Sequence, residues 1–124
     1  MKYIKLFGTS GIRGKYNDNL FPSFAYNLGK VIAIMFQKKN MRVVVGIDNR
    51  PSSKILEKAL VCGLNSVGAD VFLIGEVSTP CVSFAVGELK ADIGVMITGS
   101  HKKEGYNGFK IFNGGNTRLQ MKRR

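Results

Sequence analysis

Apolar residues recur every three or four positions over two long stretches of the chain, a spacing that predicts helices with one buried face. The first stretch covers residues 22–37, and the second begins at Pro51 and ends at Gly68. A shorter helix is expected over residues 81–89. The apolar positions of the two long helices are Phe24, Leu28, Val31, Ile32, Met35 and Phe36, then Ile55, Leu56, Ala59, Leu60, Leu64 and Val67.

Short and nearly continuous apolar runs separate these helices. Residues 42–47, 71–74 and 93–98 are such runs, which are typical of buried strands covered on both faces. Residues 108–112 are expected to form a fourth strand at an edge of the sheet. Strands that alternate with helices predict an α/β fold, here a three-layer domain with a mainly parallel or mixed four-stranded sheet and helices on both faces.

Polar loops follow the first three strands, over residues 48–53, 75–80 and 99–107. In sheets of this kind, ligands bind beyond the carboxyl ends of the strands, where loops and helix N-termini converge. The glycine-rich segment of residues 7–14 can join them. The unusual residues of the chain are therefore expected at one edge of the sheet.

Composition limits the class of protein. The 124 residues are 44% hydrophobic, which suits a single domain, placed at residues 1–113. Residues 114–124 hold four basic side chains and little apolar content, which predicts a flexible basic tail. There is no apolar run of about 18 residues to span a bilayer and no signal peptide, so a cytoplasmic protein without a membrane partner is expected. The two cysteines match neither a disulfide framework nor a zinc site.

The formal net charge of +11 favours anionic partners, such as nucleic acid or a phosphorylated metabolite. A small basic module that binds nucleic acid or another polyanion is therefore one interpretation. The chain has no recognised nucleic-acid motif, which weighs against it. Binding that falls steeply as salt rises would favour it.

The loop after the third strand places Ser100 among cations. Gly99 lets another group approach the backbone beside the hydroxyl, and Lys102 and Lys110 are available as donors. A phosphorylated serine needs such neighbours, because phosphoserine bears about −1.5 to −2 charges at neutral pH. The alternative is a basic surface turn without chemistry. His101, the only histidine, is either a surface or capping residue, or a general base or hydrogen-bond donor to phosphate.

Thr9, Ser10 and Arg13 lie in the segment GTSGIRG. A glycine loop with an arginine can form an anion cradle, although this segment fits neither a Walker loop nor a dinucleotide fingerprint. Asp48 and Arg50 can pair with one another at the entry to the second helix.

Four short motifs occur in order along the chain: FGTSGIRG at 7–14, GIDNRPSS at 46–53, STP at 78–80, and TGSH at 98–101 followed by YNGFK at 106–110. Together they resemble the first domain of the α-D-phosphohexomutase family, most closely its phosphomannomutase/phosphoglucomutase branch. The resemblance runs to about residue 112.

This resemblance implies a phosphoserine enzyme, an isomerase that moves phosphate between the 1 and 6 positions of a hexose phosphate through a bisphosphate intermediate. Ser100 would carry the phosphoryl group and ligate Mg²⁺ through it. Lys110 would lie against the phosphoserine and help with proton transfer, while Arg13 and His101 would steady the transferring phosphate. The further candidates for binding phosphate or substrate are Thr9, Ser10 and Lys102.

The sequence departs from the family in two ways. Lys102 and Lys103 stand where the family usually has asparagine and proline, which removes a backbone constraint and adds charge. Family members have four domains, and the aspartate-rich loop that holds Mg²⁺ is in the second, which has no counterpart here. The chain is therefore expected to lack its partner domains II–IV, to have no turnover alone, and to expose an interdomain surface that can drive self-association. A piece of a phosphoglucosamine mutase is the alternative within the family.

Overall fold

The computed structural model describes residues 11–36, 39–100 and 103–113. The predicted tail at 114–124 lies outside these residues. The elements along the described chain are β1 (Ile12–Lys15), α1 (Pro22–Phe36), β2 (Arg42–Ile47), α2 (Pro51–Ser66), β3 (Asp70–Glu76), α3 (Thr79–Glu88), β4 (Ile93–Ile97) and β5 (Tyr106–Asn113).

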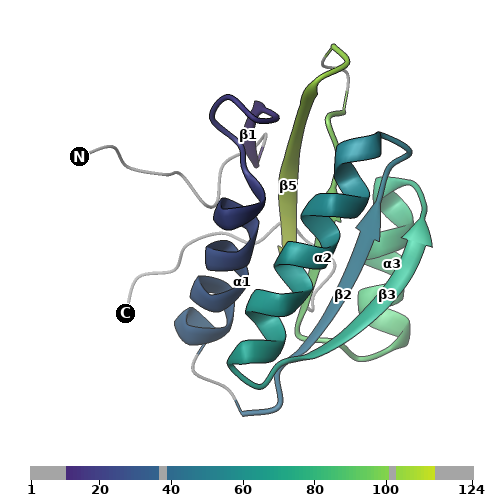
Figure 1. The fold of residues 1–124 in the computed structure, drawn as a ribbon. Coiled ribbons are helices and arrows are strands. Elements are labelled where there is room, and N and C mark those ends of the chain that lie inside the picture. The colour runs from purple at the N-terminus through teal and green to yellow at the C-terminus, as the bar shows by residue number, and fades with distance from the viewer. Residues whose placement is uncertain (1–10, 37–38, 101–102, 114–124) are drawn as a thin grey trace.

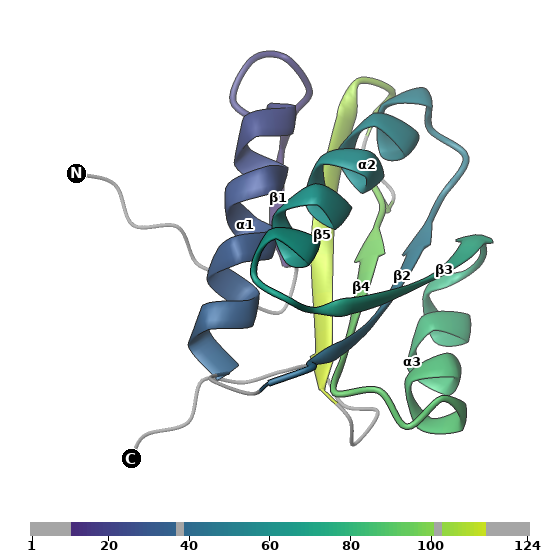
Figure 2. The ribbon, with the colours of Figure 1, turned by 60° about the horizontal axis from the view of Figure 1, so that its bottom comes forward.

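The strands form one mixed sheet in the order β1-β5-β4-β2-β3. Strand β2 is parallel to both of its neighbours, β3 and β4, whereas β5 is antiparallel to β4 and to β1. Helices α1 and α2 cover one face and α3 lies on the other (Figures 1 and 2). The predicted three-layer α/β fold is therefore confirmed.

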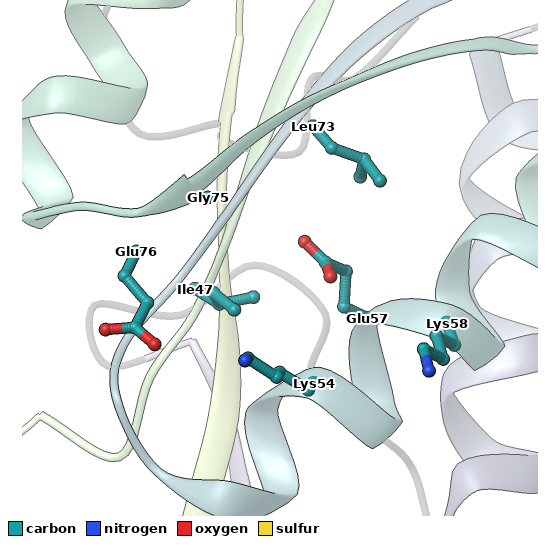
Figure 3. A pocket seen from close by; sticks show the side chains of 7 residues that line it. All are labelled: Ile47, Lys54, Glu57, Lys58, Leu73, Gly75 and Glu76. Carbon is teal, nitrogen blue, oxygen red and sulfur yellow. The ribbon is translucent and has the colours of Figure 1, made fainter.

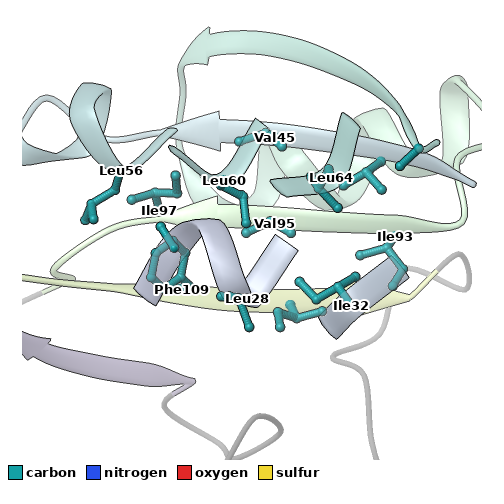
Figure 4. Packing of buried hydrophobic residues seen from close by; sticks show 14 of the residues in the cluster. Leu28, Ile32, Val45, Leu56, Leu60, Leu64, Ile93, Val95, Ile97 and Phe109 are labelled. Carbon is teal, nitrogen blue, oxygen red and sulfur yellow. The ribbon is translucent and has the colours of Figure 1, made fainter. Parts of the chain in front are cut away.

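The larger core lies between the sheet and the two long helices, as Figure 4 shows. Leucines spaced four residues apart put one stripe of α2 against the sheet, and each is fully buried. Burying a leucine side chain contributes about 1.5–3 kcal/mol, so this stripe fixes the helix to the sheet. The residues at the centre of this larger core are Leu28, Ile32, Val45, Leu56, Leu60, Leu64, Ile93, Val95, Ile97 and Phe109.

A smaller apolar cluster lies under α3 on the opposite face of the sheet. Val82 and Val86 of the helix meet Val44 of β2 and Met96 of β4, and all four are buried. Sheet residues thus alternate between two cores, as strand geometry requires. The sheet is therefore the middle layer, and the loops project from its ends.

Helices α1 and α2 pack so closely that a side chain is excluded from one contact. A Cβ on Gly63 would collide with the carbonyl oxygen of Tyr26. On the α1 side, a Cβ on Gly29 would likewise collide with the main chain of α2, at the Leu60 oxygen and the Leu64 nitrogen. The predicted inner positions Val31 and Met35 are about 40% exposed instead. Leu28 and Ile32 are buried as the three-and-four spacing predicted, and the small residues Ala25, Gly29 and Ala33 complete the buried face.

The sheet has five described strands, not four, because residues 12–15 form β1. Their sequence, Ile-Arg-Gly-Lys, has a single large apolar residue and so carries no apolar run. Pairing with β5 provides the extended conformation, with Ile12 opposite Phe109. The prediction of a strand at 108–112 was right in kind, but β5 lies between β1 and β4 and is not an edge.

Residues 71–74 belong to a strand, as predicted, but the expectation that this strand is buried on both faces was wrong. β3 is the edge strand beside β2, and its residues are mostly partly or fully exposed. Leu73 is 54% exposed. An edge strand lacks a neighbour on one side, so an apolar run alone does not distinguish it from a central strand.

Candidate functional site

Two predicted loops meet at the carboxyl ends of the parallel strands. Residues 48–50 follow β2, and residues 98–100 follow the adjacent strand β4. The loops are joined directly, because the amide of Gly99 donates to the Asp48 carboxylate at 3.0 Å. The expected convergence of polar loops is therefore observed for these two.

Arg13 approaches these two loops from β1, the edge strand on the far side of β5. It lies opposite Gly108 in the β1–β5 pairing, and a Cβ on Gly108 would lie 3.1 Å from Cγ of Arg13. The missing side chain at Gly108 lets the arginine stem cross β5. Its guanidinium Nη2 then donates to the Ser100 hydroxyl at 3.0 Å.

Lys110 shares a face of the sheet with Arg13. Side chains alternate along a strand, so Lys110 lies on the same face of β5 as Gly108 and Phe112. Arg13, opposite Gly108 in register, lies on that face too. The sequence-predicted pair of cations therefore occupies one side of the β1–β5 ribbon.

Ser100 is partly exposed and has an unusual backbone conformation. Its φ angle is 54°, in the left-handed region that few residues other than glycine adopt without a cost. Its amide donates to the Thr98 hydroxyl at 2.9 Å. Strained non-glycine residues are often found at functional sites, where surrounding contacts hold them.

Asp48 and Arg50 form the ion pair that the sequence suggested, with Nε and Oδ2 at 3.2 Å. The carboxylate also accepts bonds from the Ser53 hydroxyl at 2.5 Å and from the Arg50 amide at 3.1 Å. Burial by itself raises the pKa of Asp48, but the hydrogen bonds from Ser53, Arg50, Gly99 and Thr98 outweigh it, so the pKa is lowered. Asp48 is held as an anion beside the loop.

The Arg50 guanidinium extends from Asp48 under the following loop. Nη1 donates to the carbonyl oxygens of Lys103 at 2.8 Å and Tyr106 at 3.0 Å. Nη2 donates to the carbonyl oxygen of Ser100 at 3.3 Å. One side chain thus bonds the backbone at both ends of the Ser100–Tyr106 loop.

Asn107 connects this loop to the start of α2. Its buried amide donates to the hydroxyls of Ser52 at 2.8 Å and Ser53 at 2.9 Å, and its carbonyl accepts from the Gly108 amide. Because Ser53 in turn donates to Asp48, a continuous polar network runs from β5 to the Asp48–Arg50 pair. Buried polar groups of this kind are stable only when they are satisfied.

Of the sequence-predicted site residues, the structure brings together Arg13 and Ser100 and places Lys110 on the face of Arg13. Thr9, Ser10, His101 and Lys102 lie outside the described residues. Sequence reasoning missed the role of Arg50 toward the loop and did not select Asn107. The alternating charges of Asp48 and Arg50 were a signal for their pairing but not for the loop contact.

A separate hollow of about 400 Å³ lies between α2 and the end of β3 (Figure 3). Figure 3 shows the Glu57 carboxylate turned into it, with Lys54 and Lys58 on the same helix. Burial raises the pKa of Glu57, and the two lysines act against that rise. The hollow is lined by Ile47, Lys54, Glu57, Lys58, Leu73, Gly75 and Glu76.

Within the described ranges, no group of three or more histidine, cysteine, aspartate or glutamate side chains is placed to hold a metal ion. The Asp48 carboxylate already accepts bonds from several protein donors. These residues alone therefore do not fit a magnesium site.

The helices in the described part of the chain are all too short or too polar to cross a membrane.

Comparison with known proteins gives consistent matches over most of the chain. Residues 4–123 match the family model for phosphoglucomutase/phosphomannomutase, alpha/beta/alpha domain I. The phosphoglucosamine mutase of Bartonella tribocorum is 48% identical over 111 residues, which are 87% of this chain and 24% of that protein. The phosphoglucosamine mutase of Alkaliphilus oremlandii is 45% identical over 112 residues, 88% of this chain and 25% of that protein.

The fold also matches a solved structure. The crystal structure of a Thermus thermophilus protein described as a phosphomannomutase aligns with a TM-score of 0.85 and 32% identity. The alignment covers 96% of this chain and 28% of that one. The chain spans about a quarter of the length of the curated relatives it matches.

Proposed function

Since the chain belongs to the phosphoglucomutase/phosphomannomutase family and corresponds to its domain I, we propose that it is the serine-bearing domain of a sugar phosphomutase. Ser100 accepts a phosphoryl group from a hexose bisphosphate and returns it to a hexose monophosphate. The Ser100 oxygen forms the new bond to phosphorus, and the bond from phosphorus to the sugar oxygen breaks. The proton of the serine hydroxyl is transferred to the sugar oxygen that leaves, so the products are phosphoserine and the hexose monophosphate.

The observation that carries this proposal is the 3.0 Å bond from Arg13 to the Ser100 hydroxyl. A phosphoryl group on that oxygen would meet a guanidinium, whose planar set of donors matches phosphate geometry. The partial exposure of Ser100 leaves the hydroxyl open to a substrate. Phosphoryl transfer is catalysed mainly by positioning and charge neutralisation, which this arrangement supplies.

The remaining candidates receive roles from the family pattern. Lys110 assists the proton transfer, and His101 steadies the phosphate together with Arg13. Thr9, Ser10 and Lys102 bind phosphate or substrate. These roles require the segments around residues 9–10 and 101–102 to approach Ser100, so each is a separate hypothesis.

Magnesium would neutralise charge on the transferring phosphate when it is bound. The described residues offer it no set of carboxylates, so its protein ligands would come from outside them. The chain's own contribution is to place the serine oxygen beside Arg13. The chain spans about a quarter of its relatives' length, and we propose that turnover also requires the regions of those relatives that lie beyond the matched part.

We propose a hexose phosphate as the substrate. Both curated relatives described above carry the name phosphoglucosamine mutase. That observation favours an amino-sugar phosphate, whereas the sequence motifs suggested mannose or glucose phosphate. Competition between glucosamine, glucose and mannose 6-phosphates for the phosphoryl group of the phosphorylated chain would separate these substrates.

The direct test is incubation of the chain with glucose 1,6-bisphosphate and Mg²⁺, followed by intact-mass and peptide mass spectrometry. We expect one phosphoryl group, mapped to Ser100, on the wild type. Ser66→Ala, which removes a serine at the far end of α2, should behave like the wild type, and Ser100→Ala should remain unmodified. A phosphoryl group on another residue, or equal labelling of Ser100→Ala, would overturn the proposal.

A further inference from the structure

The guanidinium of Arg50 donates to the main-chain carbonyl oxygen of Ser100. We propose that Arg50, anchored by Asp48, is a positioning residue that holds the Ser100 backbone so that the hydroxyl faces Arg13. The inference rests on the phosphoryl-carrier function proposed for Ser100. It adds a residue that acts on the reaction through the loop conformation.

The guanidinium is itself fixed before it reaches the loop. Its Nε bonds Oδ2 of Asp48, and Asp48 is bonded in turn by Ser53. The side chains of Arg50 and Asp48 are only 18% and 19% exposed. Bonds between charged groups that are largely out of water are screened less than surface pairs, so Asp48 gives Arg50 a defined direction.

The fork of the guanidinium then bonds three carbonyl oxygens, those of Ser100, Lys103 and Tyr106. Planar donors in a fixed geometry can serve several acceptors at once, which a lysine ammonium on a flexible stem cannot do with the same directions. The acceptors lie at the beginning, middle and end of the loop. The loop is therefore held at three points by one side chain.

The Ser100 backbone needs such support. A left-handed conformation is unfavourable for a non-glycine residue, so an unsupported loop would relax from the observed φ of 54°. Arg50 bonds the carbonyl of this residue, and Thr98 bonds its amide. Together the two contacts fix both peptide units of Ser100, and the direction of its Cβ follows from them.

Gly99 is shaped for this contact. A Cβ at position 99 would collide with Cζ of Arg50 and would lie 2.5 Å from its Nε. The guanidinium thus packs directly against the backbone that precedes the serine. Its place under the loop depends on glycine at that position.

The test compares Arg50→Lys with Arg42→Lys in the full chain. Arg42 lies at the opposite end of β2, where its guanidinium stacks on Phe72, so the control makes the same chemical change away from the loop. The first readout is NMR scalar coupling at Ser100, which reports its φ angle and its χ1 rotamer. We expect one rotamer and a positive φ in the wild type and Arg42→Lys, and averaging over staggered rotamers in Arg50→Lys.

The second readout is the rate at which Ser100 takes a phosphoryl group from glucose 1,6-bisphosphate. Misplacement of a reacting group by about 1 Å can reduce a rate about 100-fold. We expect Arg50→Lys to lose about 10- to 100-fold in maximal rate, with little change in the bisphosphate concentration that gives half of it. A residue needed only for stability would move the unfolding midpoint and leave the couplings and the rate of the folded chain unchanged.

The two readouts separate this inference from the function on which it rests. If the wild type takes no phosphoryl group at Ser100, the proposed function fails, and the couplings still decide whether Arg50 orients the serine. If Arg50→Lys keeps wild-type couplings and rate, the positioning role is wrong. Should Arg50→Lys not fold, Gly99→Ala displaces the guanidinium while Arg50 stays present, and unchanged couplings in that variant would equally overturn the inference.

Discussion

Arg13 and Ser100 are 87 positions apart in the chain, yet the guanidinium of one donates to the hydroxyl of the other at 3.0 Å. The contact depends on the pairing of β1 with β5 and on the carboxyl end of β4. A strand missed by sequence pattern thus brings the cation to the serine.

Replacing Arg13 by glutamine should reduce phosphoryl incorporation at Ser100 about 100- to 1,000-fold, because a charged donor to the transferring group is lost. Stability should change by about 1 kcal/mol at most, since the contact is only partly buried. Initial rates with glucose 1,6-bisphosphate and urea unfolding measure the two effects. Lys15→Gln, an exposed change on the same strand face, is the control, and an Arg13→Gln rate within about twofold of wild type would contradict the assignment.

Gly99→Ala should destabilise the chain by about 1–3 kcal/mol, because the new methyl group would displace the Arg50 guanidinium. In an Arg50→Ala background the same change should cost much less, since the atoms it would strike are gone. A double-mutant cycle by urea unfolding measures this coupling. Additivity within about 0.5 kcal/mol would show that the two residues do not share this contact.

Asp48→Asn should make stability less dependent on pH in the acid range. The pKa of Asp48 is lowered in the folded chain, so the folded state binds fewer protons than the unfolded state. Its stabilisation is complete above the ordinary pKa of 3.8 and is lost as pH falls through the folded pKa. At neutral pH the substitution should cost about 1.5–3 kcal/mol, and urea unfolding at several pH values should show the difference from wild type shrinking towards low pH.

Glu57→Gln should change the pH dependence of stability in the opposite direction to Asp48→Asn. The pKa of Glu57 is raised by burial in the hollow beside β3, so its ionised form opposes folding as pH rises from the ordinary pKa through the folded one. The variant should equal or exceed wild-type stability at neutral pH by up to about 0.5 kcal/mol and match it in acid. A loss of stability at neutral pH, larger than at low pH, would mean that the carboxylate is favourably paired.

Gly63→Ala should separate α1 from α2, because its Cβ would strike the Tyr26 carbonyl oxygen. Overpacking of this kind costs about 1–3 kcal/mol or more, which thermal or urea unfolding can measure. Cys62→Ala, at an exposed neighbour in the same helix, should stay within about 0.5 kcal/mol of wild type. Equal stabilities of the two variants would contradict the close helix contact.

The fold was largely predictable because its strongest determinants repeat. The four-residue spacing of Leu56, Leu60 and Leu64 predicts the buried face of α2, and all three are buried. β1 was not predictable in this way, because Ile12 is its only large apolar residue and its conformation comes from β5. The exposure of Leu73 was also hidden, since burial of a strand depends on its neighbours in the sheet.

The site, like the fold, has one part that the sequence predicted and one part that it did not. Arg13 and Ser100 were selected from motifs whose residue types carry chemistry. The loop contacts of Arg50 left no such trace, because their acceptors are main-chain carbonyls of Ser100, Lys103 and Tyr106, and every residue has one. Only a structure can reveal which carbonyls an arginine reaches.

The place of β1 in the sheet affects the order in which the chain can assemble during synthesis. β1 joins the sheet through β5 alone among the described strands, and β5 is translated after all the others. The helices and the parallel strands can begin to pack while β5 is still inside the ribosome, but Arg13 has no strand to pair with until then. Pairings between such distant segments form slowly, so the serine is expected to gain its arginine in one of the last steps of folding.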